Sequence, residues 1–530
     1  MLTLQDVVYA HPNKDLLFDG LNLIVNKHDK IALVGNNGTG KSTLLQILAG
    51  RLSPTGGQVQ AQGQPYLVPQ VFGQFNRYSV AEALGIGQKL EALQQILAGE
   101  ATEESLNLLD NDWALEERCQ TALARWGLND IALTQKMETL SGGQKTKVFL
   151  SGIEVHRPEL VLLDEPSNHL DVKSRNLLYE YIQSTKNALV VVSHDRALLK
   201  LLHMVCELNK HGLVVYGGNY DFYVEQKELA SNAFAQDVKH KEKALRKAKE
   251  IEREAIERQH KLDARGKKKQ EKAGLPTIVM NMLKNSAERS TAQVKGIHAE
   301  KVGAMRQELQ QLRQNQPQTD KMKLDLDHAG LHKGKTLLKA QSVNLSRNGR
   351  WLWKEPISLQ LNSGDRMAIK GSNGSGKTTL IKLVLGELQP EQGTLERTPI
   401  KAIYIDQDYS LINNELSVYE QAQHFNTGLL QEHEIKIRLN RFLFGKDDWD
   451  KPCLALSGGE KMRLMLCTLT IAHQAPDLIV LDEPTNNLDL QNIAILTTAI
   501  NEYKGTLLVV SHDEYFLEQV NIVESVLLER

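Results

Sequence analysis

Two segments of the 530-residue chain have the residue types and spacing of a phosphate-binding loop. Each reads G-x-x-x-x-G-K-[ST], follows a short apolar run and precedes a helical pattern. The glycines let backbone N–H groups point at phosphate oxygens, and the helix N-terminus adds a partial positive charge. We expect the lysine to reach the β and γ phosphates of a nucleotide and the hydroxyl to meet the bridging Mg²⁺. The predicted nucleotide-binding residues are Gly35, Asn36, Asn37, Gly38, Thr39, Gly40, Lys41, Ser42 and Thr43, and Gly371, Ser372, Asn373, Gly374, Ser375, Gly376, Lys377, Thr378 and Thr379.

A pair of adjacent carboxylates follows each loop at the end of a short apolar run. The runs before Asp164 and Glu165 and before Asp482 and Glu483 contain only Leu, Val and Ile, which is typical of buried parallel strands. Ligand sites of α/β sheets lie at the C-terminal ends of such strands. We expect the aspartates to hold Mg²⁺ through water and the glutamates, as catalytic residues, to polarise the attacking water. The alternative is an acidic turn after a strand.

A histidine follows another apolar run in each half of the chain. His194 and His512 each stand between Ser and Asp, and this Ser-His-Asp segment directly follows β-branched residues. An isolated histidine in this setting is usually a structural residue with satisfied hydrogen bonds. Because the segment occurs twice, we favour a catalytic role in which each imidazole contacts the γ-phosphate and senses its loss.

These motifs recur in one order because the chain contains a duplicated domain. Segment 31–44 returns at 367–380, and the LSGG, Asp-Glu-Pro and Ser-His-Asp segments return after it. About 20 additional residues separate the loop from LSGG in the first copy. A chain of this length accommodates two cores and a connector. The predicted domains are a first nucleotide-binding domain at 1–228, a helical linker at 229–335 and a second nucleotide-binding domain at 336–530.

Composition excludes several other classes of protein. The formal net charge is -2 and 41% of the residues are hydrophobic, as in an ordinary globular protein. The four cysteines are scattered without C-x-x-C spacing, so neither a disulfide scaffold nor a structural zinc site is expected. The first residues do not have the pattern of a signal peptide, and no uncharged apolar run approaches the roughly 20 residues of a membrane helix. A cytoplasmic location fits these features, and any membrane partner would be another chain.

The linker is predicted to be a pair of long helices. Apolar residues at 244, 248, 251, 255 and 262 follow a spacing of three, four or seven. A helix from about 229 to 265 would extend on the order of 50 Å, and Gly266–Pro276 is the expected tip of an antiparallel hairpin. The second helix carries two apolar stripes, Leu283, Ala287, Ser290, Val294 and Ile297, and Val302, Met305, Leu309 and Leu312.

Positive charge is concentrated on this linker. Residues 231–314 contain 20 Lys and Arg against 11 Asp and Glu, a net charge of +9 in a chain of net charge -2. Lys267, Lys268 and Lys269 crowd the expected tip and are the predicted RNA-contacting residues, because structured RNA is recognised largely through phosphate and shape. An ordinary solvated helix face is the alternative. Insertion into an RNA cavity and packing on the hairpin both stay open for the apolar residues Leu275, Ile278, Val279 and Met280.

The order of the motifs resembles the ATP-binding cassette ATPases over both halves of the chain. The most specific part is LSGG, and a glutamine precedes it in each half. The resemblance implies a head-to-tail arrangement, in which the loop of one cassette and the Ser-Gly-Gly of the other close on one ATP with its Mg²⁺. Site one then combines Lys41, Ser42, Gln70, Asp164, Glu165 and His194 with Ser457, Gly458, Gly459 and Glu460. Site two combines Lys377, Thr378, Gln407, Asp482, Glu483 and His512 with Ser141, Gly142, Gly143 and Gln144.

The same resemblance implies ligands for the metal and for the base. The implied Mg²⁺ ligands are Ser42, Gln70 and Asp164 in site one and Thr378, Gln407 and Asp482 in site two. Adenine usually stacks on an aromatic residue near the start of such a cassette, and Tyr9 suits that role in the first cassette. Leu345 stands at the matching place in the second cassette and departs from the pattern.

Tandem cassettes, a long basic hairpin and the Tyr-Gly-Gly-Asn-Tyr end of the first cassette resemble the ABC-F proteins over essentially the whole chain. This resemblance implies an α/β fold of two P-loop cassettes joined by an antiparallel coiled-coil hairpin. It implies a cytoplasmic ATPase that works as a monomer with intramolecular cassette pairing and without a stable membrane partner. The implied partner is the ribosome, with contacts to rRNA and to tRNA at the exit-side site near the peptidyl-transferase centre, in translation or in protection against antibiotics.

Some residues depart from the family pattern, and two other classes stay open. Ser167 replaces the usual Thr of the first Asp-Glu-Pro-Thr segment, and Lys147 stands where an arginine, as at Arg463, is common. The additional residues of the first cassette correspond either to the small arm of the ABC-F proteins or to a longer helical subdomain. The motor of a transporter would leave the basic hairpin without a task, and a DNA-repair ATPase would carry its coiled coil inside a cassette.

Overall fold

The computed structural model describes residues 1–12, 15–70, 72–209, 212–272, 277–314, 334–347, 349–372, 374–472, 474–486 and 488–529. The chain divides into two compact units. Met1–Asp221 and Lys321–Arg530 form the first unit, which contains both cassettes, and Phe222–Asp320 forms the second, which contains the helical linker. In these described ranges, no helix has the length and apolar character needed to span a bilayer.

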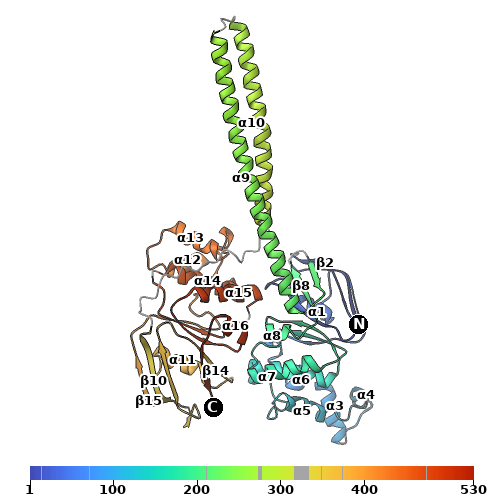
Figure 1. Cartoon of the computed structure of the whole chain (residues 1–530). Coiled ribbons are helices and arrows are strands. Elements are labelled where there is room, and N and C mark those ends of the chain that lie inside the picture. The colour runs from blue at the N-terminus through green and yellow to red at the C-terminus, as the bar shows by residue number, and fades with distance from the viewer. Residues whose placement is uncertain are drawn as a thin grey trace. The chain divides into compact units, whose positions relative to one another are not determined.

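The first cassette is built on a sheet of order β5-β6-β7-β3-β8-β9 (Figure 1). Its strands are parallel except for β9, which runs antiparallel to β8. A smaller antiparallel sheet has the order β2-β1-β4. The strands are β1 Leu2–Ala10, β2 Leu16–Val25, β3 Lys30–Val34, β4 Gly56–Ala61, β5 Tyr66–Val68, β6 Leu160–Asp164, β7 Ala188–Val192, β8 Met204–Asn209 and β9 Gly212–Tyr216.

Helices cover this sheet and connect its strands. They are α1 Lys41–Leu48, α2 Val80–Ala83, α3 Gly87–Leu97, α4 Glu103–Leu109, α5 Leu115–Arg125, α6 Gly142–His156, α7 Val172–Ser184 and α8 Arg196–Leu199, with 3₁₀ turns at Gly73–Phe75 and Met137–Thr139. Every residue of β3, β6 and β7 is buried, which explains why these strands are apolar apart from Lys30 and Asp164 at their ends. The predicted strand before the first carboxylate pair is confirmed, because β6 ends at Asp164.

The second cassette repeats this architecture with a parallel sheet of order β16-β17-β18-β14-β19 and an antiparallel sheet of order β13-β10-β15. Its strands are β10 Thr336–Asn344, β11 Ser346–Arg347, β12 Arg350–Trp351, β13 Ile357–Asn362, β14 Arg366–Gly371, β15 Gln392–Arg397, β16 Ala402–Ile405, β17 Leu478–Asp482, β18 Thr506–Val510 and β19 Glu524–Leu528. Its helices are α11 Lys377–Leu385, α12 Val418–His424, α13 Glu432–Arg441, α14 Gly458–Ile471, α15 Leu490–Glu502 and α16 Glu514–Gln519, with 3₁₀ turns at Lys446–Asp448 and Cys453–Ala455. The predicted fold of two α/β cassettes is therefore confirmed.

The additional residues of the first cassette form a pair of helices. In both cassettes a short helix, α2 or α12, begins with a Ser-x-x-Glu capping box. A longer helix, α5 or α13, then packs against the helix that begins with the Ser-Gly-Gly motif. Helices α3 and α4 lie between α2 and α5, whereas the fully described residues 425–431 join α12 to α13 without a helix. The first cassette thus has a helical extension that the second does not have at this place.

The linker contains two long helices, α9 Tyr220–Lys272 and α10 Thr277–Gln314. The first helix is longer than predicted at both ends, because it begins at Tyr220 and continues through Gly266. At 1.5 Å per residue its 53 residues extend about 80 Å. The prediction that the tip begins at Gly266 is wrong. One glycine costs a helix only about 1 kcal/mol, and the lysines and glutamates around it are good helix formers. Residues 273–276, including Leu275, lie outside the described residues.

Helices α9 and α10 lie side by side and antiparallel (Figure 1). Lys241 in the first half of α9 pairs with Glu308 near the end of α10 at 2.7 Å, and Arg313 pairs with Glu242 at 2.6 Å. The second predicted stripe of α10 is confirmed, because Val302 and Leu309 are buried and Met305 and Leu312 are half-buried. The side chains of the first stripe, Leu283, Ala287, Ser290, Val294 and Ile297, lie outside the described residues.

The stripe predicted on α9 is only partly correct. Ala248 and Ala255 are half-buried, but Ala244, Ile251 and Leu262 are exposed, the last two at 47% and 54%. Within 238–262, the less exposed positions define a seam, which consists of Val238, Leu245, Ala248, Glu252, Ala255, Ile256 and Gln259. The positions of the apolar residues alone did not predict the buried face of α9, because several seam positions of this charged helix are alanine or polar residues.

Candidate nucleotide sites

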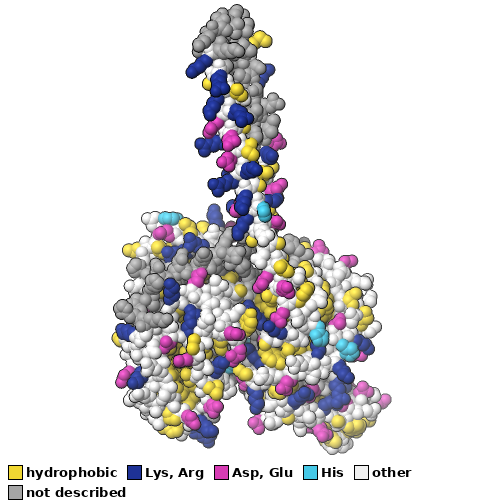
Figure 2. Space-filling view, in the orientation of Figure 1, with side chains coloured by type: hydrophobic (Ala, Val, Ile, Leu, Met, Phe, Trp, Pro, Cys, Tyr) yellow, Lys and Arg dark blue, Asp and Glu magenta, His cyan; other side chains and the backbone are white. Residues whose placement is uncertain are grey.

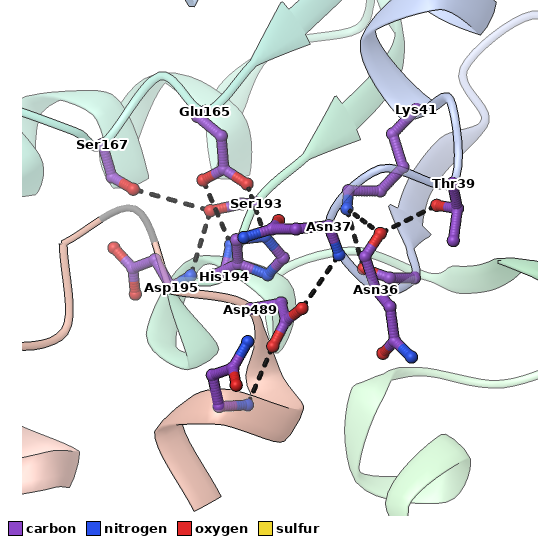
Figure 3. A network of polar contacts seen from close by, with 12 residues as sticks. Asn36, Asn37, Thr39, Lys41, Glu165, Ser167, Ser193, His194, Asp195 and Asp489 are labelled. Carbon is purple, nitrogen blue, oxygen red and sulfur yellow. Dashed lines mark hydrogen bonds and ion pairs between the residues drawn. The ribbon is translucent and has the colours of Figure 1, made fainter. Parts of the chain in front are cut away.

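The first phosphate-binding loop joins β3 to α1 and needs its glycines. Gly35 has φ 153°, and a Cβ there would lie 2.3 Å from the carbonyl oxygen of Leu208. Gly40 is the N-cap of α1 with φ 94°, in the left-handed region. The Lys41 ammonium donates to the carbonyl oxygens of Gly35 at 2.7 Å and Asn36 at 3.0 Å (Figure 3). Burial lowers the pKa of Lys41, and the charge of Glu165 opposes this shift. The loop therefore holds the Lys41 ammonium against its own backbone carbonyl groups, and contact with phosphate stays a prediction.

The Asp164 carboxylate has the features expected of a magnesium ligand. Asp164 is buried at the C-terminal end of β6, and a hydrogen bond joins it to the Ser42 side chain. Its Oδ1 atom is buried and has no hydrogen-bond partner among the described residues. Burial raises the pKa of Asp164 above its ordinary value. A hard cation with oxygen ligands would satisfy this oxygen, so Ser42 and Asp164 fit the predicted Mg²⁺ site.

Glu165, the residue after Asp164 in the chain, forms a buried pair with His194, and Figure 3 shows this pair. The Oε1 atom of Glu165 lies 3.2 Å from Nε2 of His194, and its Oε2 accepts from the His194 backbone N–H at 3.2 Å. Burial, followed by the charge of Asp164, raises the pKa of Glu165. Burial, followed by the charge of Lys41, lowers the pKa of His194 to about 3, so its imidazole is neutral at pH 7. The pair is a polar contact to a neutral imidazole.

Both candidate catalytic glutamates have a strained backbone. Glu165 and Glu483 each have φ 49°, in the left-handed region that L residues rarely adopt. Each backbone N–H donates to a neighbouring strand at 2.8 Å, Glu165 to Val192 and Glu483 to Val510. Strain of this kind persists only where the surrounding structure fixes it, and it occurs in both copies. The sharp turn directs both carboxylates from the strand end toward the histidine.

The second site repeats the pair with different neighbours. Nε2 of His512 lies 3.4 Å from Oε1 of Glu483 and 2.9 Å from the Lys377 ammonium. Burial raises the pKa of Glu483 to about 7. Burial and the charge of Lys377 lower the pKa of His512 to about 4. In this site the Tyr404 hydroxyl donates to Oδ2 of Asp482 at 2.9 Å, whereas the Asp164 carboxylate bonds to Ser42. The two sites are similar in composition but not identical in contacts.

The Ser-Gly-Gly motifs form the N-termini of α6 and α14. Ser141 and Ser457 are the N-caps, and each hydroxyl accepts from the N–H three residues later at 3.3 Å. The Gln144 and Glu460 side chains reach back to the N-cap N–H groups at 2.9 and 2.8 Å. The fourth position of each motif therefore closes a capping box. Both helix starts carry a partial positive charge suited to phosphate.

Residues of both cassettes meet at site one. A cavity of about 440 Å³ is lined by Lys41, Ser42, Asp164 and His194 of the first cassette and by Ser457 of the second. Asp489, the N-cap of α15, accepts through Oδ2 from the backbone N–H of Asn37 at 2.8 Å (Figure 3). The structure thus brings together the loop of one cassette and the Ser-Gly-Gly of the other, as the composite arrangement predicts. Sequence reasoning missed the role of Asp489.

The structure places the remaining predicted residues as follows. Gln70 lines the cavity of site one, and Gln407 is exposed. The Tyr9 ring packs 6.0 Å from the Phe18 ring and is not part of the cavity wall, to which His11 contributes instead. Asn373 lies outside the described residues.

The departures from the family pattern lie near the sites. Leu345 packs against the core of the second cassette. The Ser167 hydroxyl is buried, 3.5 Å from the hydroxyl of Ser193. Lys147 is half-buried, close enough to lower the pKa of Asp171. None of these residues replaces a group of the Glu–His pairs.

Comparisons with known proteins agree with this geometry. The family described as ABC transporter matches residues 18–168 and 355–486. The chain is 30% identical to the putative ATP-binding protein YdiF of Bacillus subtilis, over 96% of the chain and 77% of that protein. It is 31% identical to the ATP-binding protein Uup of Haemophilus influenzae, over 95% and 75%. It is 29% identical to ABC transporter F family member 5 of Arabidopsis thaliana, over 94% and 70%.

A solved structure shares the fold of the whole chain. It is the archaeal ribosome recycling factor aABCE1 in complex with the ribosomal stalk protein aP1, which matches 97% of this chain and 86% of its own with a TM-score of 0.60. At 20% identity, this likeness concerns the fold alone. The two cassettes, the composite site one and relatives that match along nearly the whole of this chain lead to one conclusion: the chain is an ATPase that belongs to the ABC-F subfamily of the ATP-binding cassette family.

Proposed function

We propose that this ATPase binds the ribosome through its basic hairpin, near the exit-side tRNA and the peptidyl-transferase region, and there modulates translation or protects against ribosome-targeting antibiotics. Two solved neighbours support the direction of this proposal, because one is described as a ribosome recycling factor and another as ribosome-bound. The protein acts in the cytoplasm as a monomer whose two cassettes pair with each other, without a stable membrane partner. ATP closes the cassettes on both sites, and the nucleotide state sets the affinity of the hairpin for RNA.

At each site, the residues divide the work of hydrolysis. Lys41 and Lys377 bind the phosphates, and Glu165 and Glu483 polarise the attacking water. His194 and His512, which are neutral at pH 7, hold the glutamates in place and contact the γ-phosphate. Ser42 and Asp164, and Thr378 and Asp482, hold Mg²⁺. When bound, this ion neutralises charge on the β and γ phosphates.

The observation that carries the RNA-binding proposal is a basic face on α9. At about 100° per residue, one arc of this helix lies opposite the seam. Figure 2 shows Lys and Arg side chains along the hairpin. Three acidic residues on this arc, Glu250, Glu254 and Glu257, compare with eight exposed cations, so positive charge dominates the arc. The exposed cations of this arc are Lys239, Lys243, Arg246, Lys247, Arg258, Lys261, Arg265 and Lys268.

The basic face of α9 is better suited to bind a nucleic-acid polyanion than to bind an acidic protein helix, because the positive charge extends along a long stretch of α9. From Lys239 to Lys268 the rise of the helix is about 44 Å. Lys243, Arg246 and Lys247 are exposed and form no ion pair with any residue that the structure describes. Phosphate binding through such side chains releases counterions and is sensitive to salt. Of the predicted tip lysines, Lys268 is exposed, and the side chains of Lys267 and Lys269 lie outside the described residues.

Reversal of charge on this face is expected to weaken ribosome binding. In the triple variant Lys243→Glu, Arg246→Glu and Lys247→Glu, the apparent affinity for purified ribosomes should fall at least about tenfold at moderate salt, because about three phosphate contacts are lost. The slope of log affinity against log salt should become shallower by about two to three. Co-sedimentation across a salt series measures both quantities, and far-UV circular dichroism checks that the helix persists.

The matched control changes the same amount of charge on the cassettes. Lys186, Lys382 and Lys504 are exposed, and their replacement by Glu should leave ribosome binding within about twofold of the parent protein. Equal loss in the two triple variants would show that net charge, and not the α9 face, governs binding. Unchanged pelleting of the hairpin variant would contradict the proposal directly.

A further inference from the structure

Arg175 belongs to the first cassette but lies at the site of the second. It occupies the first turn of α7, four residues after the N-cap Asp171. Its Nε donates to the carbonyl oxygen of Leu170 at 3.2 Å, and its Nη1 donates to the carbonyl oxygen of His512 at 3.5 Å. The guanidinium therefore bridges the segment before α7 in one cassette and the Ser-His-Asp segment of the other.

The internal duplication shows that site one does not receive the same group. Glu165 and Glu483, His194 and His512, and Asp171 and Asp489 are all separated by 318 residues. The counterpart of Arg175 is therefore Ile493, which is 3% exposed and packs in the apolar core of the second cassette. At site two, the first cassette supplies a cation, Arg175. At the equivalent place in the second cassette, next to site one, the residue is the aliphatic Ile493.

A second arginine of the first cassette contacts the same region of the second. Nη1 of Arg196 donates to Oε1 of Gln519 at 3.0 Å, and its guanidinium lies 4.5 Å from the centre of the Tyr515 ring. The counterpart of Arg196 is Glu514, which pairs with Lys370 inside its own cassette at 2.8 Å. The asymmetry at Arg175 is thus part of a one-sided contact, in which two arginines of the first cassette hold residues 512–519.

The charge of Arg175 also acts on His512 of site two. After burial and Lys377, it lowers the pKa of His512. This effect favours a neutral imidazole at site two. At site one, the groups that act on the pKa of His194 are burial and Lys41. An arginine is suited to this role because its planar fork donates in two directions and stays charged.

We propose that Arg175 is a positioning residue that the first cassette supplies to site two, where it fixes the His512 backbone and so orients the His512–Glu483 pair. Hydrolysis at site two then depends on contact with α7, whereas hydrolysis at site one proceeds without an equivalent cation. The rate of ATP hydrolysis at site two is therefore controlled by Arg175, and the rate at site one is not. This inference rests on the proposed role of Glu483 as the water-polarising residue.

The test isolates one site at a time in the full chain. In the Glu165→Gln background only site two turns over, and in the Glu483→Gln background only site one does. Arg175→Ile, which reproduces the residue of the other cassette, should lower kcat at site two about tenfold and change the KM for ATP less than about twofold. It should leave site one within about twofold of its parent. Arg175→Lys, which keeps the charge and one donor, should recover part of the lost kcat.

Lys173→Ile provides the matched control, because Lys173 is exposed on the same turn of α7 and should change neither site. Equal losses at both sites, or a lowered melting temperature with no recovery by Arg175→Lys, would show a merely structural role and overturn the inference. Unchanged kcat at site two in Arg175→Ile would also overturn it. If instead the Glu165→Gln, Glu483→Gln double variant hydrolyses ATP as fast as the Glu165→Gln single variant, the assignment of Glu483 fails first, and the two failures are distinguished.

Discussion

Replacement of both Glu165 and Glu483 by Gln is expected to slow ATP hydrolysis by about 10² to 10⁴. Each carboxylate lies at the end of a buried strand, in a left-handed turn that directs it to a neutral histidine. Gln keeps the size and the hydrogen bonds of the side chain but cannot accept a proton. ATP should still bind, so the double variant should hold ATP in the closed form. Steady-state phosphate release and retention of labelled ATP on a desalting column measure the two effects.

The control for this double variant uses glutamates outside the sites. Glu138 and Glu180 are exposed, and Gln at both positions should leave hydrolysis within about twofold of the parent. Each single variant, Glu165→Gln or Glu483→Gln, should retain turnover at the other site. If the double variant hydrolyses ATP at the rate of the parent, neither glutamate polarises the water and the assignment is wrong.

A negative charge at Ser457 is expected to stop hydrolysis at site one, although Ser457 belongs to the second cassette. Ser457 is the N-cap of α14 and lines the cavity that contains Lys41 and Asp164. Asp is as good an N-cap as Ser, so Ser457→Asp should preserve the helix while it repels the γ-phosphate. In the Glu483→Gln background, turnover should fall by about 10² or more, since repulsion between two negative charges in contact at a protein surface amounts to about 4 kcal/mol.

The reciprocal variant shows whether this effect follows the composite arrangement. Ser141→Asp caps α6 in the same way and should stop hydrolysis at site two, which the Glu165→Gln background isolates. Circular dichroism and melting temperature check that both variants stay folded. If Ser457→Asp impairs site two and spares site one, the phosphate-binding loop of one cassette does not pair with the Ser-Gly-Gly motif of the other.

Motif spacing predicted most of the chemical groups because the groups lie next to rigid elements. A G-x-x-x-x-G-K motif requires a strand before it and a helix after it, and β3–α1 and β14–α11 supply them. The Asp-Glu pairs follow runs without polar residues, which form the buried strands β6 and β17. Short-range sequence patterns determine such positions, so an isolated sequence is sufficient to predict them.

Contacts between distant segments could not be predicted in this way. The bond from Asn37 to Asp489 joins residues 452 positions apart, and Arg175 meets His512 across the two cassettes. The wall of site one contains His11, whereas the family pattern pointed to Tyr9. A strand alternates its faces residue by residue, and a β-bulge changes that alternation, as between Val7 and Tyr9 in β1. Such register shifts depend on how β1 pairs with β2, so they cannot be predicted from the spacing of residues in the sequence.

The hairpin shows a different limit of the sequence. Gly266 suggested a turn, but helix propensity summed over GKKKQEK outweighs one glycine, and α9 continues to Lys272. The apolar residues Ile251 and Leu262 suggested the buried face, yet they are exposed. The seam instead combines apolar residues with alanine and with long polar side chains such as Glu252 and Gln259, whose aliphatic parts cover surface.

The central claim is that the nucleotide state of the two sites controls binding to the ribosome. The most direct measurement is co-sedimentation of the Glu165→Gln, Glu483→Gln variant with purified ribosomes, with ATP, with ADP and without nucleotide, across a salt series. We predict that the variant pellets with ribosomes in ATP, that pelleting weakens as salt rises, and that little pellets in ADP or without nucleotide. Equal pelleting in all three nucleotide conditions, or none in any of them, would contradict the claim.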